Sequence, residues 1–245
     1  MIAPIENDAI SLVLSIALSY LAYRQGMLTA NGSVAAFAVS ASVGVLGNLS
    51  WLLIILTFVI AAFVTTRFNI LDKAGRGLQE GKKGERGTVN VIANSLPAVV
   101  ISAASHIFGN GVSGTYFAII FITSISAAAS DTLASEVGVL DRNTRLITTM
   151  KPVPTGTDGG ISATGTLAAL GGAFFIAFVG LAMTAWFGSP IPLWSVPLIA
   201  FLGFAGSNVD SLLGATLERK GILGKQTNNI ASITIVTLIA AVMLL

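Results

Sequence analysis

The stretch SWLLIILTFVIAAFVTT, residues 50–66, contains no charged residue, and its strongly polar groups are all hydroxyls. Apolar runs of about 17 to 25 residues are long enough for an α-helix to cross a bilayer. The whole chain shares this character, because 54% of its 245 residues are hydrophobic and 10% are charged. A soluble domain usually carries about 25% charged residues. The sequence therefore predicts an integral membrane protein.

Similar apolar runs recur along the chain and predict about eight spans in one integral membrane domain covering residues 1–245. The second run is short, so about seven spans with a re-entrant segment are the alternative. Either count predicts an all-α, polytopic transmembrane helix bundle. The start MIAPIEND lacks the basic segment of a cleavable signal, so we expect the first run to be retained. The runs are Asp8–Tyr23, Ser33–Leu46, Ser50–Thr66, Val89–Phe108, Thr115–Ala134, Ser162–Phe187, Trp194–Gly214 and Asn229–Leu245.

Basic residues follow every second predicted span, whereas the connections around Gly47, Gly109 and Ser189 contain none. With eight spans, all of the basic residues lie on one face of the membrane, and the positive-inside rule assigns this face to the cytoplasm. Both termini then lie on the other side. Because topology accounts for these charges, we expect no nucleic-acid partner. The residues are Arg24 after the first span; Arg67, Lys73, Arg76, Lys82, Lys83 and Arg86 after the third; Arg142, Arg145 and Lys151 after the fifth; and Arg219, Lys220 and Lys225 after the seventh.

The most unusual polar residues lie at the ends of the fifth and seventh spans, on that same face. Asp131 and Ser135 are four residues apart and share one side of a helix. Asp210 and Ser211 lie in a stripe of small and polar residues. A carboxylate at the membrane boundary is costly unless it is paired or bound to a metal, so both aspartates are candidate functional residues. Glu136 joins them only if the fifth helix ends near Ser135.

Short internal similarities link these segments. DTLAS at 131–135 resembles DSLLG at 210–214, and GERGTVNVIANS at 84–95 resembles GKQTNNIASIT at 224–234. Within the segment 84–95, Arg86, Asn90 and Asn94 are spaced by four residues and share one face of a helix. These similarities predict repeated helical hairpins whose cytoplasmic ends surround one site. Chance similarity between short segments is the alternative.

The connection VPTGTDGGISATG, residues 153–165, is rich in glycine and hydroxyl side chains within an otherwise apolar chain. Glycines leave backbone amides uncovered, and successive amides in a turn can bind an anion. Asp158 would repel a phosphate, but with Mg²⁺ it becomes a ligand, as do Asp131 and Asp210. The loop and the aspartates together predict phosphate chemistry at one membrane surface. A helix-breaking connector with a solvated aspartate is the alternative.

Other chemistries find little support. The chain has no cysteine, which excludes disulfides and thiolate catalysis. Its single histidine, His106, is predicted at the outer end of the fourth span, far from the other polar residues. A serine–histidine–aspartate triad or a histidine metal site is therefore disfavoured. The segment GRGLQEGKK, residues 75–83, lacks the spacing of a P-loop.

Three stretches, SDTLASEVG (130–138), LITTMKPVPTGTDGGISATGTLAALGG (146–172) and GSNVDSLLGATLER (206–219), resemble the phytyl-phosphate kinase family of the vitamin E pathway. This membrane family also has many prokaryotic members, and the resemblance covers most of the chain. It implies transfer of a phosphoryl group from CTP, or another nucleoside triphosphate, to an isoprenoid monophosphate such as phytyl, geranylgeranyl or polyprenyl phosphate. The chain starts without a plastid transit peptide, so we expect a prokaryotic cell membrane protein.

Combined with this resemblance, the candidate residues form four groups around a cytoplasmic-face site. We expect Asp131, Asp158 and Asp210 to bind Mg²⁺ with support from Glu136 and Asn208; Lys82, Lys83 and Arg86 to neutralise phosphates; Gly156, Thr157, Gly159 and Gly160 to cradle them; and Asn90, Asn94, Ser135, Ser162 and Ser211 to complete the substrate site.

Two other classes of activity remain open. A cytidylyltransferase would use the same substrates and ions to make a CDP-lipid, and the sequence does not separate it from a kinase. A transporter or lipid scramblase would hold its polar residues near the middle of the bilayer. The candidate residues lie toward one face, which favours an enzyme. The nucleotide donor, the prenyl chain length and the oligomeric state are left open.

Overall fold

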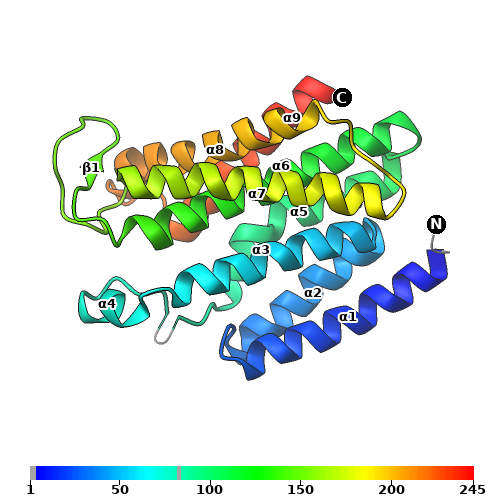
Figure 1. The fold of residues 1–245 in the computed structure, drawn as a ribbon, viewed down its shortest axis with the longest axis horizontal. Coiled ribbons are helices and arrows are strands. Elements are labelled where there is room, and N and C mark those ends of the chain that lie inside the picture. Colours follow the sequence, from blue (N-terminus) through cyan, green and yellow to red (C-terminus); the bar gives the residue numbers. More distant parts are fainter. Residues whose placement is uncertain (1–3, 82–83) are drawn as a thin grey trace.

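The computed structural model describes residues 4–81 and 84–245. Within this part of the chain, eight long helices follow the predicted runs and pass in turn from one end of a bundle to the other (Figure 1). The all-α, polytopic bundle is therefore confirmed. The helices are α1 (Pro4–Arg24), α2 (Ala30–Leu46), α3 (Leu49–Arg67), α5 (Thr88–Phe108), α6 (Val112–Gly138), α7 (Ala163–Trp186), α8 (Ser195–Leu213) and α9 (Lys225–Leu244).

The helix α2 is the shortest of these. It has 17 residues, which at about 1.5 Å per residue give about 25 Å, less than the roughly 30 Å hydrocarbon core. In the described part of the chain, seven other helices are long and apolar enough to span a membrane. Nevertheless α2 runs back along α1 as a full pass of the bundle, so the two termini lie at the same end (Figure 1).

The helix α6 forms the centre of the bundle. In the most apolar stretch of α6, 83% of the residues are buried, whereas the share is 22–50% in the other spanning helices. It packs against α3, α5, α7, α8 and α9, while the α1–α2 hairpin covers the outer side of α3 and α5. The indole of Trp51 on α3 stacks on Phe121 of α6 with ring centroids 4.4 Å apart. Polar residues near the end of α6 are thus held inside the protein rather than in lipid.

Small and hydroxyl residues let the helices around α6 approach closely. A Cβ atom at Gly206 of α8 would lie 2.8 Å from the Cβ of Ala127 on α6, which is closer than such atoms tolerate. The Ser130 hydroxyl donates to the Ala169 carbonyl of α7 at 2.9 Å. Large apolar side chains such as Val13, Phe178 and Val242 point outward and are exposed, as a lipid-facing surface requires.

Four short elements not predicted from the sequence cluster at one end of the bundle. They are the helix α4 (Ile70–Gly75), the two-stranded hairpin of β1 (Arg145–Leu146) and β2 (Gly160–Ile161), and a π-helical turn, η1 (Gly214–Glu218), that continues α8. Figure 1 shows α4 and β1 at the end opposite the termini. Connections that carry the basic residues meet at this end.

Candidate functional site

A polar cavity of about 370 Å³ lies where α6 and α8 end and α5, α7 and α9 begin. Every predicted site residue within the described part of the chain lines it, so the expected convergence of the helix ends is observed. Lys82 and Lys83 lie outside the described residues. The residues brought together are Arg86, Asn90, Asn94, Asp131, Ser135, Glu136, Gly156, Thr157, Asp158, Gly159, Gly160, Ser162, Asn208, Asp210 and Ser211.

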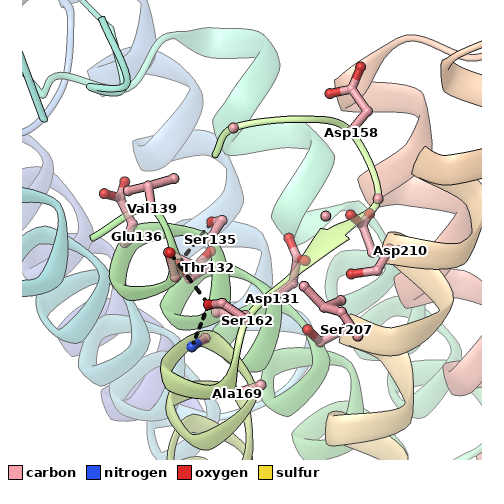
Figure 2. A pocket seen from close by; sticks show the side chains of 18 of the residues that line it. Asp131, Thr132, Ser135, Glu136, Val139, Asp158, Ser162, Ala169, Ser207 and Asp210 are labelled. Atoms are coloured by element: carbon pink, nitrogen blue, oxygen red, sulfur yellow. Dashed lines mark hydrogen bonds between the residues drawn. The ribbon is translucent and has the colours of Figure 1, made fainter. Parts of the chain in front are cut away.

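Two aspartates from different helices face each other in this cavity. Figure 2 shows the carboxyl group of Asp131 on α6 beside that of Asp210 on α8, so the two carboxylates interact electrostatically. Such carboxylates repel each other strongly unless a cation or a shared proton lies between them. Among the residues that the structure describes, the cations Lys225 and Arg86 act on Asp131 from other elements. The pair is therefore built to receive a cation or a proton.

Helix α9 and the π-helical turn support this pair. The Ser232 hydroxyl donates to the Asp210 carboxylate at 3.2 Å. The side-chain amide of Asn228 donates to the Asp210 carbonyl at 3.1 Å and to the Glu218 carboxylate at 3.2 Å. A π-helical turn interrupts the regular ladder of a helix, and such turns are frequent at functional sites. Here the turn brings Glu218 to the rim of the cavity.

The helix α6 does not end near Ser135 but continues to Gly138, so Glu136 lies on the other side of α6 from Asp131 (Figure 2). Its carboxylate accepts bonds from the Lys73 ammonium at 2.8 Å and from the Thr66 hydroxyl at 2.7 Å. Arg86 lies 4.0 Å away. Because both oxygens of Glu136 are engaged within the protein, the expectation that it supports a metal ion is not met by this geometry.

Lys73 is the main participant that the sequence did not identify. It lies on α4, and its side chain is only 1% exposed. Its ammonium group also donates to the Thr65 carbonyl at 2.9 Å, near the end of α3. In the sequence it is one of several basic residues in a connection, and nothing in the charge pattern marks it as buried.

Arg86 links the two sides of the cavity. Burial lowers the pKa of its guanidinium from the ordinary value, and the carboxylates of Glu136, Glu80 and Asp131 oppose that shift. An arginine remains protonated under such conditions. A fixed guanidinium among carboxylates presents several donors to an incoming anion.

Arg86 begins a polar face that continues along α5, as its spacing predicted. The Asn94 amide donates to the Asn90 carbonyl at 2.9 Å, and the Asn90 amide donates to Glu80 at 3.2 Å. Glu80 also receives the Lys225 ammonium of α9 at 3.1 Å. Lys225 was predicted only as a topology marker. A signal for its role existed, because it belongs to the segment that resembles the start of α5.

The glycine-rich connection forms one wall of the cavity. Gly159 has φ +73°, and a Cβ atom there would overlap Ala215 of η1, so only glycine allows this approach. Several of its amides are already engaged; around Gly159, Thr157 donates to the Pro154 carbonyl at 3.2 Å and Gly160 to the Thr157 carbonyl at 2.8 Å. A phosphate would therefore meet only the remaining amides of this loop.

Two hydroxyls of this loop are also committed to local structure. Ser162 accepts a bond from the Gly165 amide at 3.1 Å and thereby caps α7. The Thr157 hydroxyl donates to the Pro154 carbonyl at 2.6 Å. Both residues still line the cavity. Their structural bonds fix the shape of the loop.

Asp158 is set apart from the aspartate pair. It is exposed, and Figure 2 shows it on the loop with its carboxyl group directed away from Asp131 and Asp210. Within residues 4–81 and 84–245, no group of three or more histidine, cysteine, aspartate or glutamate side chains is arranged to hold a metal ion. The expected cluster of three aspartates is therefore not formed, and the pair stands alone.

Fold and site together define a polytopic helical membrane protein with a polar, carboxylate-bearing cavity at one end of its bundle. The chain belongs to the family described as Integral membrane protein DUF92, whose model matches residues 13–239. This match confirms the membrane family that the sequence motifs indicated. No solved structure matches the chain.

Relatives come from archaea, cyanobacteria and plants. Uncharacterized membrane protein MJ0933 of Methanocaldococcus jannaschii is 36% identical over 182 residues, covering 74% of this chain and 70% of the relative. Uncharacterized membrane protein sll0875 of Synechocystis is 34% identical over 169 residues, covering 69% and 63%. Protein VTE6, chloroplastic, of Arabidopsis thaliana is 34% identical over 162 residues, covering 62% and 46%. The chain thus spans less than two thirds of the Synechocystis and Arabidopsis proteins.

Proposed function

We propose that the chain is a kinase that transfers a phosphoryl group from CTP, or another nucleoside triphosphate, to an isoprenoid monophosphate. The observation that carries this proposal is the facing pair Asp131 and Asp210 in a polar cavity that also contains Arg86 and a glycine-rich loop. Resemblance to the phytyl-phosphate kinase family and similarity to Protein VTE6, chloroplastic, support the same conclusion.

The chemistry requires positioning more than strong bases. An oxygen of the acceptor phosphate forms a bond to the γ-phosphorus, and the bond from that phosphorus to the bridging oxygen of the donor breaks. The products are an isoprenoid diphosphate and a nucleoside diphosphate. A phosphate monoester is largely ionised near neutral pH, so the main difficulty is to bring two polyanions together.

The donor set of the cavity fits a magnesium ion held together with the substrate. Mg²⁺ in phosphoryl-transfer enzymes is commonly bound by one or two carboxylates, with substrate phosphates and water as the other ligands. Asp131 and Asp210 supply two adjacent carboxylates, and among the described residues no third acidic side chain completes a metal-binding group with them. Bound there, the ion would neutralise developing negative charge on the phosphates.

The remaining residues divide the task of binding the anions. Arg86 donates to the acceptor phosphate, and Lys225 counters the charge of the donor from the start of α9. Amides of the glycine-rich loop not engaged internally hold the transferred group. Ser232 and Asn228 orient Asp210 through the bonds described above. The Lys73–Glu136 pair positions Arg86 from the other side of α6.

We also propose that the cavity faces the cytoplasm of a prokaryotic cell. The cavity lies at the end of the bundle where the basic connections meet, which is the end that the positive-inside rule assigns to the cytoplasm. Nucleoside triphosphates are available on that side, and an acceptor in the cytoplasmic leaflet can present its phosphate at the same depth.

The deciding experiment incubates detergent-purified protein with labelled prenyl monophosphates and each nucleoside triphosphate in turn. We expect the isoprenoid diphosphate and the nucleoside diphosphate in equal amounts. Release of pyrophosphate with a CDP-lipid would establish the cytidylyltransferase instead. Lipid movement across proteoliposomes without nucleotide turnover would establish a transporter or scramblase. Wild-type protein beside the Asp131→Asn variant, with matched elution profiles, separates activity of this chain from a contaminant.

A further inference from the structure

A second, smaller cavity of about 60 Å³ lies beside the polar one, between α2, α3 and α5. Its walls are mainly apolar and include Leu28, Ala36, Phe58, Ala62 and Val91. Helices of a bundle usually pack without such gaps, because interiors reach the density of organic crystals. A partly open apolar space between helices and close to a charged site can hold the apolar part of a ligand.

The two cavities meet at shared residues. Arg86, Asn90 and Asn94 line both. The Asn94 side chain is buried, and its carbonyl oxygen has no hydrogen-bond partner among the described residues. A buried acceptor without a donor is costly. Because an ionised phosphate accepts hydrogen bonds and does not donate them, a water molecule beside the ligand would supply the missing donor.

The junction therefore joins a cationic, hydrogen-bonding surface to an apolar chamber. An isoprenoid monophosphate has the matching form, with an anionic head directly attached to a branched hydrocarbon. Resting on the proposed function, we propose that the second cavity is the acceptor subsite, which takes the first isoprene unit while Arg86 holds the phosphate at the junction.

The size of the chamber supports one unit rather than a long chain. A water molecule needs about 10–15 Å³ of cavity volume, so about 60 Å³ admits roughly four to six heavy atoms. An isoprene unit contributes five carbon atoms. Later units of the tail must then lie outside the chamber, along the lipid-facing helices. The subsite therefore selects the first isoprene unit of the acceptor and sets no limit on the length of its hydrocarbon tail.

The test fills the chamber and measures binding of the smallest acceptor. Ala62 on α3 is buried and lines the chamber, whereas its neighbour Ala61 does not. We expect Ala62→Leu to raise the KM for dimethylallyl monophosphate tenfold or more, because it removes most of the space for apolar burial. The KM for the nucleotide should change less than twofold. Ala61→Leu is the matched control and should leave both values near those of wild type.

A second variant and a binding measurement on wild-type protein keep the test decisive if Ala62→Leu does not fold. Ala36 lines the chamber from α2 and is only partly buried, so Ala36→Leu is expected to fold and to raise the same KM. Thermal stabilisation of wild-type protein by dimethylallyl monophosphate should also exceed that by methyl phosphate, without nucleotide present.

The outcomes separate the two proposals. If wild type turns over prenyl monophosphates but both filled variants keep the control KM, the acceptor subsite is refuted and the kinase proposal stands. Equal stabilisation by dimethylallyl monophosphate and methyl phosphate refutes the subsite as well. If wild type transfers no phosphoryl group to any prenyl monophosphate, the proposed function is refuted together with the subsite.

Discussion

Removing the ammonium of Lys73 tests the most buried charge pair of the structure. The side chains of Lys73 and Glu136 are 1% and 8% exposed, and their charged atoms are 2.8 Å apart. Lys73→Met keeps most of the aliphatic stem but removes the charge and the donor. Glu136 then retains the Thr66 hydroxyl at 2.7 Å and Arg86 at 4.0 Å, while the Thr65 carbonyl loses its donor.

The expected loss follows from what remains around the carboxylate. Removing one partner of a buried ion pair costs about 3–5 kcal/mol, since the other charge stays buried without its counterion. Thr66 and Arg86 partly compensate Glu136, so we expect about 3 kcal/mol for Lys73→Met. Glu136→Gln removes the counterion and leaves the ammonium with neutral acceptors only, so it should cost about as much. The double variant should lose about 2 kcal/mol less than the sum of the two, because the partners are in contact.

Unfolding in mixed micelles with increasing dodecyl sulfate, followed by circular dichroism, gives the free energy for each variant. The matched control is Lys225→Met, whose ion pair with Glu80 is also short at 3.1 Å but whose side chain is 61% exposed. Exposed pairs contribute about 0–1 kcal/mol, so this variant should unfold almost as wild type does. A loss below about 1 kcal/mol for Lys73→Met, or additive single losses, would refute the buried-pair reasoning.

Four further outcomes are expected. Asp131→Asn and Asp210→Asn should each lower prenyl-diphosphate formation about a hundredfold or more, and the double variant should be little worse, because the two act as a unit; a tenfold further loss would contradict that. Asp158→Asn should lower it less than about tenfold, since this carboxyl group is exposed and directed away from the aspartate pair; a loss equal to that of Asp131→Asn would place the loop carboxylate at the phosphates. Gly159→Ala should destabilise the protein by about 1–3 kcal/mol and reduce turnover, since it combines a positive φ with overlap on Ala215; unchanged turnover and melting would contradict the close approach. Single cysteines placed in 75–81, 143–151 or 219–225 of this cysteine-free chain should be labelled only from the cytoplasmic side, and labelling of any of these loops in intact cells by an impermeant reagent would overturn the orientation.

The long helices could be predicted because a membrane imposes one dominant rule on them. The run predicted at Val89–Phe108 is the helix Thr88–Phe108, and the run at Ser162–Phe187 is the helix Ala163–Trp186 with Ser162 as its cap. The fifth predicted run ends at Ala134, whereas its helix continues to Gly138. Its last turn is polar but covered by other elements, and hydropathy alone cannot recognise a polar segment that is buried by protein.

The short elements escaped prediction for a related reason. A helix of six residues such as α4, or a two-residue strand such as β1, is too short to display a period in its sequence. What stabilises α4 is Lys73, which enters the protein and bonds to Glu136 more than sixty residues later. Such long-range contacts leave no local signal.

The convergence of Asp131 and Asp210 was predictable because their surroundings repeat, whereas the separation of Glu136 and Asp158 from them was not. For Glu136 the outcome depended on whether one helix continued for another turn. For Asp158 it depended on how a loop with Gly159 packs against η1. Sequence can therefore propose which residues gather at one end of a bundle. The division of labour among them follows from tertiary contacts.

The continuation of α6 would let one cavity hold the two anions of the proposed reaction. Five residues along an α-helix advance roughly 7.5 Å and rotate roughly 140°, so Asp131 and Glu136 project from different sides of the same helix end. Asp131 meets Asp210, where a cation would gather donor phosphates, and Glu136 meets Lys73 and Arg86, where a fixed positive charge would hold the acceptor. Because the central helix sets this separation, the distance between the two anion sites would not depend on any mobile loop. Inserting one alanine between Asp131 and Glu136 turns one of the two groups by about 100° relative to the other, so it should abolish transfer and weaken binding of at least one of the two substrates.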